Sequence, residues 1–186
     1  FQPDLNYHNP EVKQAMFDVA RFWLNKGVDG FRLDIISAIY EDPELRRNPA
    51  SFRITPSDKS LTIFFQNLKN NFLQAKSFEF ATELRSVIDE FDHPQRVLIG
   101  ESHGNEELIS QFCYSNGKKG LDAIFLFKAI SMPFKAEKYR EMLMTFEKHF
   151  PEPLIPTLVF ANHDRTRIIT RLGGSIEKAK LLALFQ

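Results

Sequence analysis

The strongest constraint on the fold is a strict alternation of helical and strand-like segments. Apolar residues recur at helical spacing in some segments, and short continuous apolar runs typical of buried strands lie between them. The predicted helices cover residues 10–26, 61–91, 106–114, 136–150 and a last segment from Ser175, and the predicted strands cover residues 31–36, 96–100, 121–127 and 155–160. This order is typical of a parallel sheet whose strands are joined by helices.

Two architectures have this alternation, an open doubly wound sheet and a barrel of eight strand–helix units. A doubly wound sheet commonly has a Gly-rich phosphate turn after an early strand, and the sequence has none. In a barrel, working residues lie at the carboxyl ends of several strands. Asp34, Glu101 and Asp164 fall at such ends. We therefore predict an α/β fold that is part of a (β/α)8 TIM barrel, with four of its eight strands in this chain.

The first of these strand ends carries two charges, Arg32 and Asp34, in an apolar run. Strand side chains alternate with a period of two, so both residues face the same side and can neutralise each other. We expect this pairing to keep the Asp34 carboxylate ionised in a partly dry place. A lone Arg-x-Asp is more often a structural ion pair. The acids at two further strand ends, Glu101 and Asp164, instead favour carbohydrate chemistry.

Cleavage of a glycosidic bond needs an acid that protonates the leaving oxygen and a second carboxylate on the other side of the ring. Asp34, paired with Arg32, is the better candidate for the ionised nucleophile. Glu101 has no adjacent cation in the sequence, so we expect desolvation to raise its pKa and keep it protonated. Asp164 beside His163 could bind sugar hydroxyls and stabilise the developing positive charge. The sequence gives no carboxylate separation, so these arguments leave the stereochemistry open.

The amino-acid composition argues against nucleic acid and membranes as partners. Lys plus Arg and Asp plus Glu number 24 each, so we expect no nucleic acid and no membrane partner. Apolar residues make up 43% of the chain and no apolar run reaches the length of a membrane span. The single Cys113 excludes an internal disulfide, and we predict that it lies in the core. The lack of disulfides suits a cytoplasmic protein.

Four short segments then identify a family. Gly30-Phe31-Arg32-Leu33-Asp34, Gly100-Glu101 and Asn162-His163-Asp164 resemble, in the same order, three signature regions of the α-amylase family of retaining α-glycoside hydrolases. Gln2-Pro3-Asp4-Leu5-Asn6 resembles a fourth region, in the form typical of the oligo-1,6-glucosidase and α-glucosidase branch. One short motif is weak support, but four in order across almost the whole chain are strong support.

The resemblance implies Asp34 as the nucleophile, Glu101 as the general acid/base and Asp164 as the transition-state stabiliser. The substrate it implies is an oligosaccharide or disaccharide. We therefore predict a retaining α-glucosidase that hydrolyses α-1,6 or α-1,4 links through a glucosyl-enzyme on Asp34. Alternatives within the family are a trehalose synthase, a sucrose-active enzyme and a non-catalytic relative, the last disfavoured because the three acids are present. A serine hydrolase is disfavoured because no Gly-x-Ser-x-Gly motif occurs.

The same resemblance implies substrate-binding residues. Arg32 would orient the nucleophile, and His163 and Arg167 would contact the glucose. Ile35 follows the nucleophile at a position where relatives that prefer α-1,6 links tend to carry Val and α-1,4 enzymes a smaller residue or Thr. A bulky β-branched side chain there favours α-1,6 links.

The resemblance also predicts the place of the chain in the domain. Residues 1–186 would form about strands 4 to 7 of the catalytic barrel, with 1–9 the tail of the loop after strand 3. The remaining strands, the family's first signature region and a C-terminal β-domain would lie outside this span. Calcium ligands of relatives lie largely outside it too, so we predict no metal and no cofactor within the chain. We expect these residues to be unstable or inactive alone.

Overall fold

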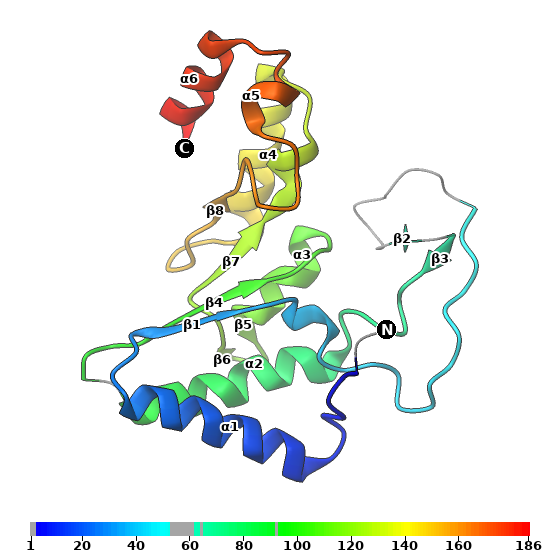
Figure 1. The fold of residues 1–186 in the computed structure, drawn as a ribbon, viewed down its shortest axis with the longest axis vertical. Helices are drawn as coiled ribbons and strands as arrows, with labels where there is room; N and C mark the ends of the chain where they lie inside the picture. Colours follow the sequence, from blue (N-terminus) through cyan, green and yellow to red (C-terminus); the bar gives the residue numbers. More distant parts are fainter. Residues whose placement is uncertain (1–2, 53–61, 64, 92) are drawn as a thin grey trace. The chain divides into compact units, whose positions relative to one another are not determined.

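The computed structural model describes residues 3–52, 62–63, 65–91 and 93–186 (Figure 1). These residues form two compact units, Phe1–Ile124 and Phe125–Gln186. The helices of the first unit are α1 (Pro10–Asn25), η1 (Ile36–Ala38), α2 (Ala75–Ile88), η2 (Asp89–Phe91), α3 (Glu106–Ile109) and η3 (Ser110–Phe112). Its strands are β1 (Gly30–Leu33), β2 (Thr62–Ile63), β3 (Gln66–Asn67), β4 (Val97–Glu101), β5 (Tyr114–Ser115) and β6 (Lys118–Lys119).

Strand β7 (Ala123–Leu126) spans the boundary between the units. The second unit continues with η4 (Phe127–Ser131), α4 (Ala136–His149), β8 (Thr157–Leu158), α5 (Ile168–Arg171) and α6 (Ile176–Phe185). The predicted positions of α1, α4, α6 and the four main strands are confirmed, although β1, β7 and β8 are shorter than predicted.

Both units contain parallel strands joined through a helix, as the alternation predicts. In the first unit β1 pairs with β4, with Gly30 opposite Val97 and Leu33 opposite Gly100, and α2 lies between them in the sequence. In the second unit β7 pairs with β8, with Phe125 opposite Thr157, and α4 lies between them in the sequence. The parallel register brings the carboxyl ends of paired strands to the same edge.

Helix α1 begins and ends at the predicted signals. The Asn9 side chain accepts a hydrogen bond from the backbone N–H of Glu11 at 3.0 Å, and Pro10 occupies the first helical position. After the helix, Gly27 has a φ of +93°, which favours glycine. Local sequence therefore sets both ends of this helix.

The buried face of α1 differs from the prediction. Phe17, Ala20 and Leu24 are buried, and Phe17 stacks on Phe80 of α2 with ring centroids 5.4 Å apart. Figure 1 shows α1 and α2 side by side. Trp23, which the spacing assigns to the core, is 49% exposed in the described structure. Apolar residues occupy a wide arc of this helix, and periodicity alone does not say which part of the arc meets α2.

The predicted helix over residues 61–91 is wrong in its first half. Helix α2 begins only at Ala75, because Leu73 has a φ of +57° and Gln74 is extended. The Gln74 amide donates to the carbonyl oxygens of Lys69 (2.6 Å) and Phe72 (3.2 Å) and stabilises this turn. Before residue 73 the apolar residues recur at helical spacing, although the described backbone there is not helical. Residues 61 and 64 lie outside the described residues.

Strand β4 is held in place by a buried ion pair. Arg85 of α2, with a side chain only 5% exposed, pairs with Asp122 at 2.9 Å and with Asp89 at 2.8 Å. Asp122 also accepts a hydrogen bond from the backbone N–H of Leu98 at 2.7 Å. These contacts fix β4, and therefore Glu101 at its end, against α2.

The cores of the two units consist of apolar side chains from the strands and from the helix faces that cover them. Cys113, only 1% exposed, lies in the core of the first unit, which confirms the prediction, and burial raises the pKa of its thiol to about 12. In the first unit the core includes Ile36, Leu98, Phe112, Leu121 and Ile124, and in the second unit Leu126, Tyr139, Met142, Phe146 and Phe160.

None of the helices in the described part of the chain is both long enough and apolar enough to cross a membrane.

Candidate active site

One group of predicted site residues lies at the carboxyl ends of β1 and β4. Asp34 directly follows β1, and Glu101 is the last residue of β4. Since Leu33 pairs with Gly100, the parallel register places the two acids at one edge of the sheet. Acids at the carboxyl ends of neighbouring parallel strands occupy the position where barrel enzymes carry their working residues.

Arg32 connects these two acids. Its Nη1 donates to Oδ1 of Asp34 at 2.5 Å, and its Nη2 donates to Oε2 of Glu101. The predicted pairing of Arg32 with Asp34 is therefore confirmed. A guanidinium presents several N–H donors in a fixed plane, so one side chain can hold two carboxylates in a defined arrangement.

The environments of the two acids differ. The Glu101 side chain is 9% exposed, as the apolar strand predicts, whereas the Asp34 side chain is 71% exposed. The expectation of a partly dry Asp34 is wrong for the described structure, because this residue lies beyond the strand end. Glu101 has no adjacent cation in the sequence, but Arg32, 69 residues earlier, contacts it in the structure. Adjacency in sequence could not reveal this partner.

A cavity of about 460 Å³ opens beside Arg32 and Asp34. Asp4 and Tyr7 line it from the amino-terminal loop, so the structure brings part of the fourth signature region to the nucleophile candidate. Apolar side chains of α1 complete the wall. The cavity therefore combines an apolar surface with a few polar groups, an arrangement typical of small-molecule sites.

The backbone at Ile35 is strained. This residue has φ 37° and ψ 50°, in the left-handed region that β-branched side chains rarely adopt. The turn lets the next residue, Ile36, enter the core with no exposed surface. Strain of this kind is often found at functional sites. A sequence pattern gives no signal for it.

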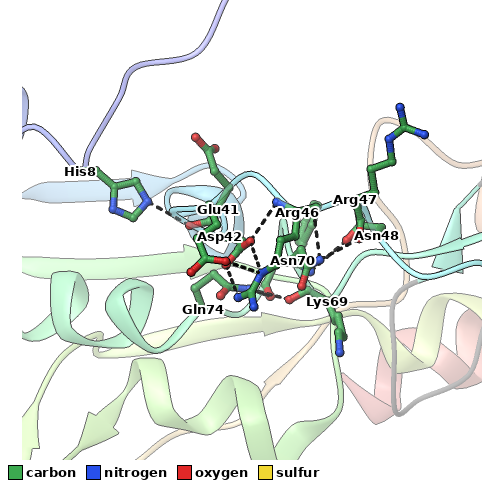
Figure 2. Close-up of polar contacts among 11 residues, drawn as sticks. His8, Glu41, Asp42, Arg46, Arg47, Asn48, Lys69, Asn70 and Gln74 are labelled. Atoms are coloured by element: carbon green, nitrogen blue, oxygen red, sulfur yellow. Dashed lines mark hydrogen bonds and ion pairs between the residues drawn. The ribbon is translucent and has the colours of Figure 1, made fainter.

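The segment after β1 is held by a polar cluster that sequence reasoning missed. Asp42, only 4% exposed, accepts hydrogen bonds from the backbone N–H of Arg46 (2.9 Å) and from its Nε (2.7 Å) and Nη2 (2.6 Å). The Asn70 amide donates to the carbonyls of Arg46 and Arg47 (Figure 2). The Arg46 guanidinium holds the pKa of Asp42 at about 2. Three prolines and mixed charges predict a surface loop over residues 38–58. These contacts order part of that segment, and residues 53–58 lie outside the described residues.

A second group of predicted site residues lies within the second unit. His163 and Asp164 follow β8 on a turn, with Nε2 of His163 3.4 Å from Oδ1 of Asp164, and their side chains are 80% and 68% exposed. Arg167 precedes α5 as its N-cap residue and is exposed. The side-chain oxygen of Asn162 is buried without a hydrogen-bond partner in the described residues.

Within the described ranges, no group of three or more His, Cys, Asp or Glu side chains is arranged to hold a metal ion. The absence of a metal from the chain, with calcium possible outside this span, stays a prediction from the sequence.

Paired parallel strands joined by helices, with acids at their carboxyl ends, define the class as an α/β protein of the barrel type with a carboxylate site. The family described as alpha amylase, catalytic domain, matches residues 1–186, and the chain belongs to this family. Its fold is part of a (β/α)8 barrel, as predicted.

Similar proteins agree with this assignment. The chain is 34% identical to a probable alpha-glucosidase of Rhizobium meliloti (strain 1021), over 98% of the chain and 34% of that protein. It is 27% identical to the oligo-1,6-glucosidase of Parageobacillus thermoglucosidasius, over 99% of the chain and 34% of that protein. Among solved structures, the alpha-glucosyl transfer enzyme XgtA matches with a TM-score of 0.79 and 32% identity, over 94% of the chain and 33% of that structure. The chain thus spans about a third of the length of these proteins.

Proposed function

We propose that the protein containing this chain is a retaining α-glucosidase that releases terminal glucose from short α-glucosides. The observation that carries this proposal is the bridge by Arg32 between Asp34 and Glu101 at the carboxyl ends of two paired strands. This arrangement holds one exposed and one buried carboxyl group together, and the chemistry needs one nucleophile and one acid.

In the first step a carboxylate oxygen of Asp34 forms a bond to the anomeric carbon as the bond to the leaving oxygen breaks. Glu101 gives its proton to that oxygen, so the aglycone leaves as a neutral alcohol. In the second step Glu101 takes a proton from water, whose oxygen bonds to the anomeric carbon. The bond to Asp34 breaks as this new bond forms, glucose leaves with its α configuration, and both acids return to their starting states.

The shared contact with Arg32 supports the retaining route. Retaining glycosidases carry their carboxyl groups about 5–5.5 Å apart, whereas inverting enzymes need about 6.5–9.5 Å to admit a water. The two nitrogens of Arg32 that contact Asp34 and Glu101 share one carbon, which keeps the two acids close. We therefore propose direct attack by Asp34 rather than attack by an intervening water.

The remaining roles belong to the second unit. We assign Asp164 to stabilisation of the positive charge that develops on the sugar ring, because its exposed carboxylate can face a substrate. His163 and Arg167 would bind glucose hydroxyls. The support is their match to the family's signature region and their exposed side chains.

The bulky side chain of Ile35 leads us to favour α-1,6 links. It lies beside Asp34 and lines the same cavity, so its size can select the substrate at the point of cleavage. The similarity to an oligo-1,6-glucosidase supports this preference. We also propose that the enzyme needs no cofactor, since carboxyl groups and water suffice, and that it is cytoplasmic.

Glucosyl transfer is the second candidate function. Its support is the similarity to XgtA, a structure described as an alpha-glucosyl transfer enzyme. The two reactions share the glucosyl-enzyme and differ only in the acceptor, which is water in hydrolysis and a second sugar in transfer. The acceptor therefore has to be measured.

The test compares isomaltose, maltose, sucrose and trehalose as substrates of the full-length protein and of Asp34→Ala. Glucose released by the wild type and not by the variant supports the α-glucosidase. A wild type that converts one disaccharide into another, or builds longer products, is a transferase or isomerase. A wild type that changes none of the four refutes the proposal. Ile35→Thr tests linkage, because a smaller side chain should lower the ratio of isomaltose to maltose cleavage.

A further inference from the structure

Arg171, the last residue of α5, donates hydrogen bonds to three backbone carbonyls. Its Nε donates to the carbonyl of Thr166 at 3.1 Å, and its Nη1 and Nη2 donate to the carbonyls of Ile130 and Phe160. All four residues belong to the second unit. One guanidinium thus connects three separate stretches of backbone.

Two of these carbonyls flank the loop that carries His163 and Asp164. Phe160 lies just before residues 161–165 and Thr166 lies just after them. The third carbonyl, that of Ile130, belongs to η4, the segment that follows β7. Since β7 and β8 are paired, Arg171 fixes both ends of the Asp164 loop relative to the neighbouring strand.

Two side chains of this loop are largely exposed in the described structure. The side chains of His163 and Asp164 are 80% and 68% exposed, so they bury little surface. The buried side-chain oxygen of Asn162 has no hydrogen-bond partner in the described residues. An ordered loop loses conformational entropy, and contacts at its two ends offset part of that cost.

Arginine suits this position and lysine does not. The guanidinium is planar and offers five N–H donors in a fixed arrangement, so it can contact three carbonyls at once. A lysine carries its donors on a single nitrogen, which cannot reach three backbone segments in the same way. Helix α5 helps to fix the side chain, because the backbone N–H of Arg171 bonds to the carbonyl of Arg167 at 3.1 Å.

We propose that Arg171 is a positioning residue that sets the place of the Asp164 carboxylate for catalysis. This inference rests on the proposed function, in which Asp164 stabilises the transition state. In this inference the effect of Arg171 on the reaction passes through the backbone of residues 160–166. Its loss therefore lowers the rate of the chemical step more than it weakens substrate binding.

The test uses Arg171→Lys in the full-length protein, with Arg140→Lys as the matched control. Arg140 lies on the exposed surface of α4, and its replacement is the same chemical change. With the disaccharide that the wild type cleaves fastest, we expect kcat of R171K to fall about tenfold to a hundredfold, as for a small misplacement of a catalytic group. KM should change by less than about threefold. R140K should keep the wild-type values. Circular dichroism at the assay temperature gives the folded fraction, and kcat is expressed per folded molecule.

A double-mutant cycle with Asp164→Asn separates positioning from general damage. If Arg171 acts through Asp164, R171K lowers kcat far less in the D164N background than in the wild type. Equal losses in both backgrounds, or a wild-type kcat for R171K, overturn the inference. If R171K does not fold, Arg171→Gln replaces it, with the same expected loss of kcat and the same cycle.

The two proposals fail in different ways. A wild type without activity on any α-glucoside removes the proposed function. A wild type that is active and loses activity in D164N, combined with a normal R171K, removes only the role of Arg171.

Discussion

Arg32 and Glu101 are 69 residues apart in the sequence, yet the guanidinium of Arg32 donates a hydrogen bond to the Glu101 carboxylate at the end of the β1–β4 pair. The same guanidinium holds Asp34 through its other terminal nitrogen at 2.5 Å. The nucleophile and the acid of the proposed reaction are thus organised by one side chain.

Arg32→Lys should lower kcat/KM for the best substrate by about a hundredfold, because a single ammonium group cannot hold both carboxylates in the same arrangement. Steady-state kinetics of the full-length variant measure this effect. Arg47→Lys is the matched control, because the Arg47 side chain is exposed and points away from the polar cluster in Figure 2. A variant that keeps wild-type kcat/KM would show that the bridge is not needed.

Gly30→Ala should severely destabilise the protein, whereas Gly27→Ala should cost only about 1–2 kcal/mol. Both glycines have positive φ angles, +150° and +93°. A Cβ at Gly30 would collide with the backbone of Val97 in β4, while a Cβ at Gly27 meets open space. Urea unfolding of the two variants gives the free energies of unfolding. Similar losses for both would contradict the close approach of β1 and β4.

Asp42→Asn should change how stability depends on pH. Hydrogen bonds from Arg46 lower the pKa of Asp42 to about 2, from a usual value of 3.8. The folded state therefore gains stability from the ionised carboxylate above about pH 5, and this gain is lost as the pH falls from about 4 to 2. The difference in Tm between wild type and D42N should be largest at neutral pH and shrink over that interval.

The control for Asp42 is Glu44→Gln. The Glu44 carboxylate also lies near Arg46, 3.5 Å from its Nε, but the Glu44 side chain is 72% exposed. We expect its Tm to follow the wild type across the pH range. A difference between wild type and D42N that stays constant from pH 7 to pH 2 would mean that the Asp42 charge does not stabilise the fold.

Local sequence predicts much of this fold because many of its signals act over a few residues. Asn9 and Pro10 begin α1, Gly27 ends it, and the apolar runs mark the parallel strands. The acids Asp34 and Glu101 lie at the carboxyl ends of β1 and β4, where a barrel places its working groups. The alternation of segments and the position of acids at strand ends are thus readable without coordinates.

The features that sequence did not reveal depend on contacts between distant residues or on backbone geometry. The partner of Glu101 is Arg32 on another strand, and the carbonyls held by Arg171 carry no side-chain signature. The left-handed backbone at Ile35 opposes the preference of its own side chain. The exposure of Trp23 depends on which face of α1 packs against α2. Periodicity counts apolar positions and says nothing about these partners.

The central claim is that Asp34 forms a covalent bond to glucose. The most direct measurement treats the full-length protein with an activated glucosyl fluoride whose glucosyl-enzyme hydrolyses slowly, followed by proteolysis and mass spectrometry. We predict that the peptide containing Asp34 gains the mass of the glucosyl group, and that Asp34→Asn abolishes the label. An active enzyme that gives no labelled peptide, or a label on another residue, would contradict Asp34 as the nucleophile.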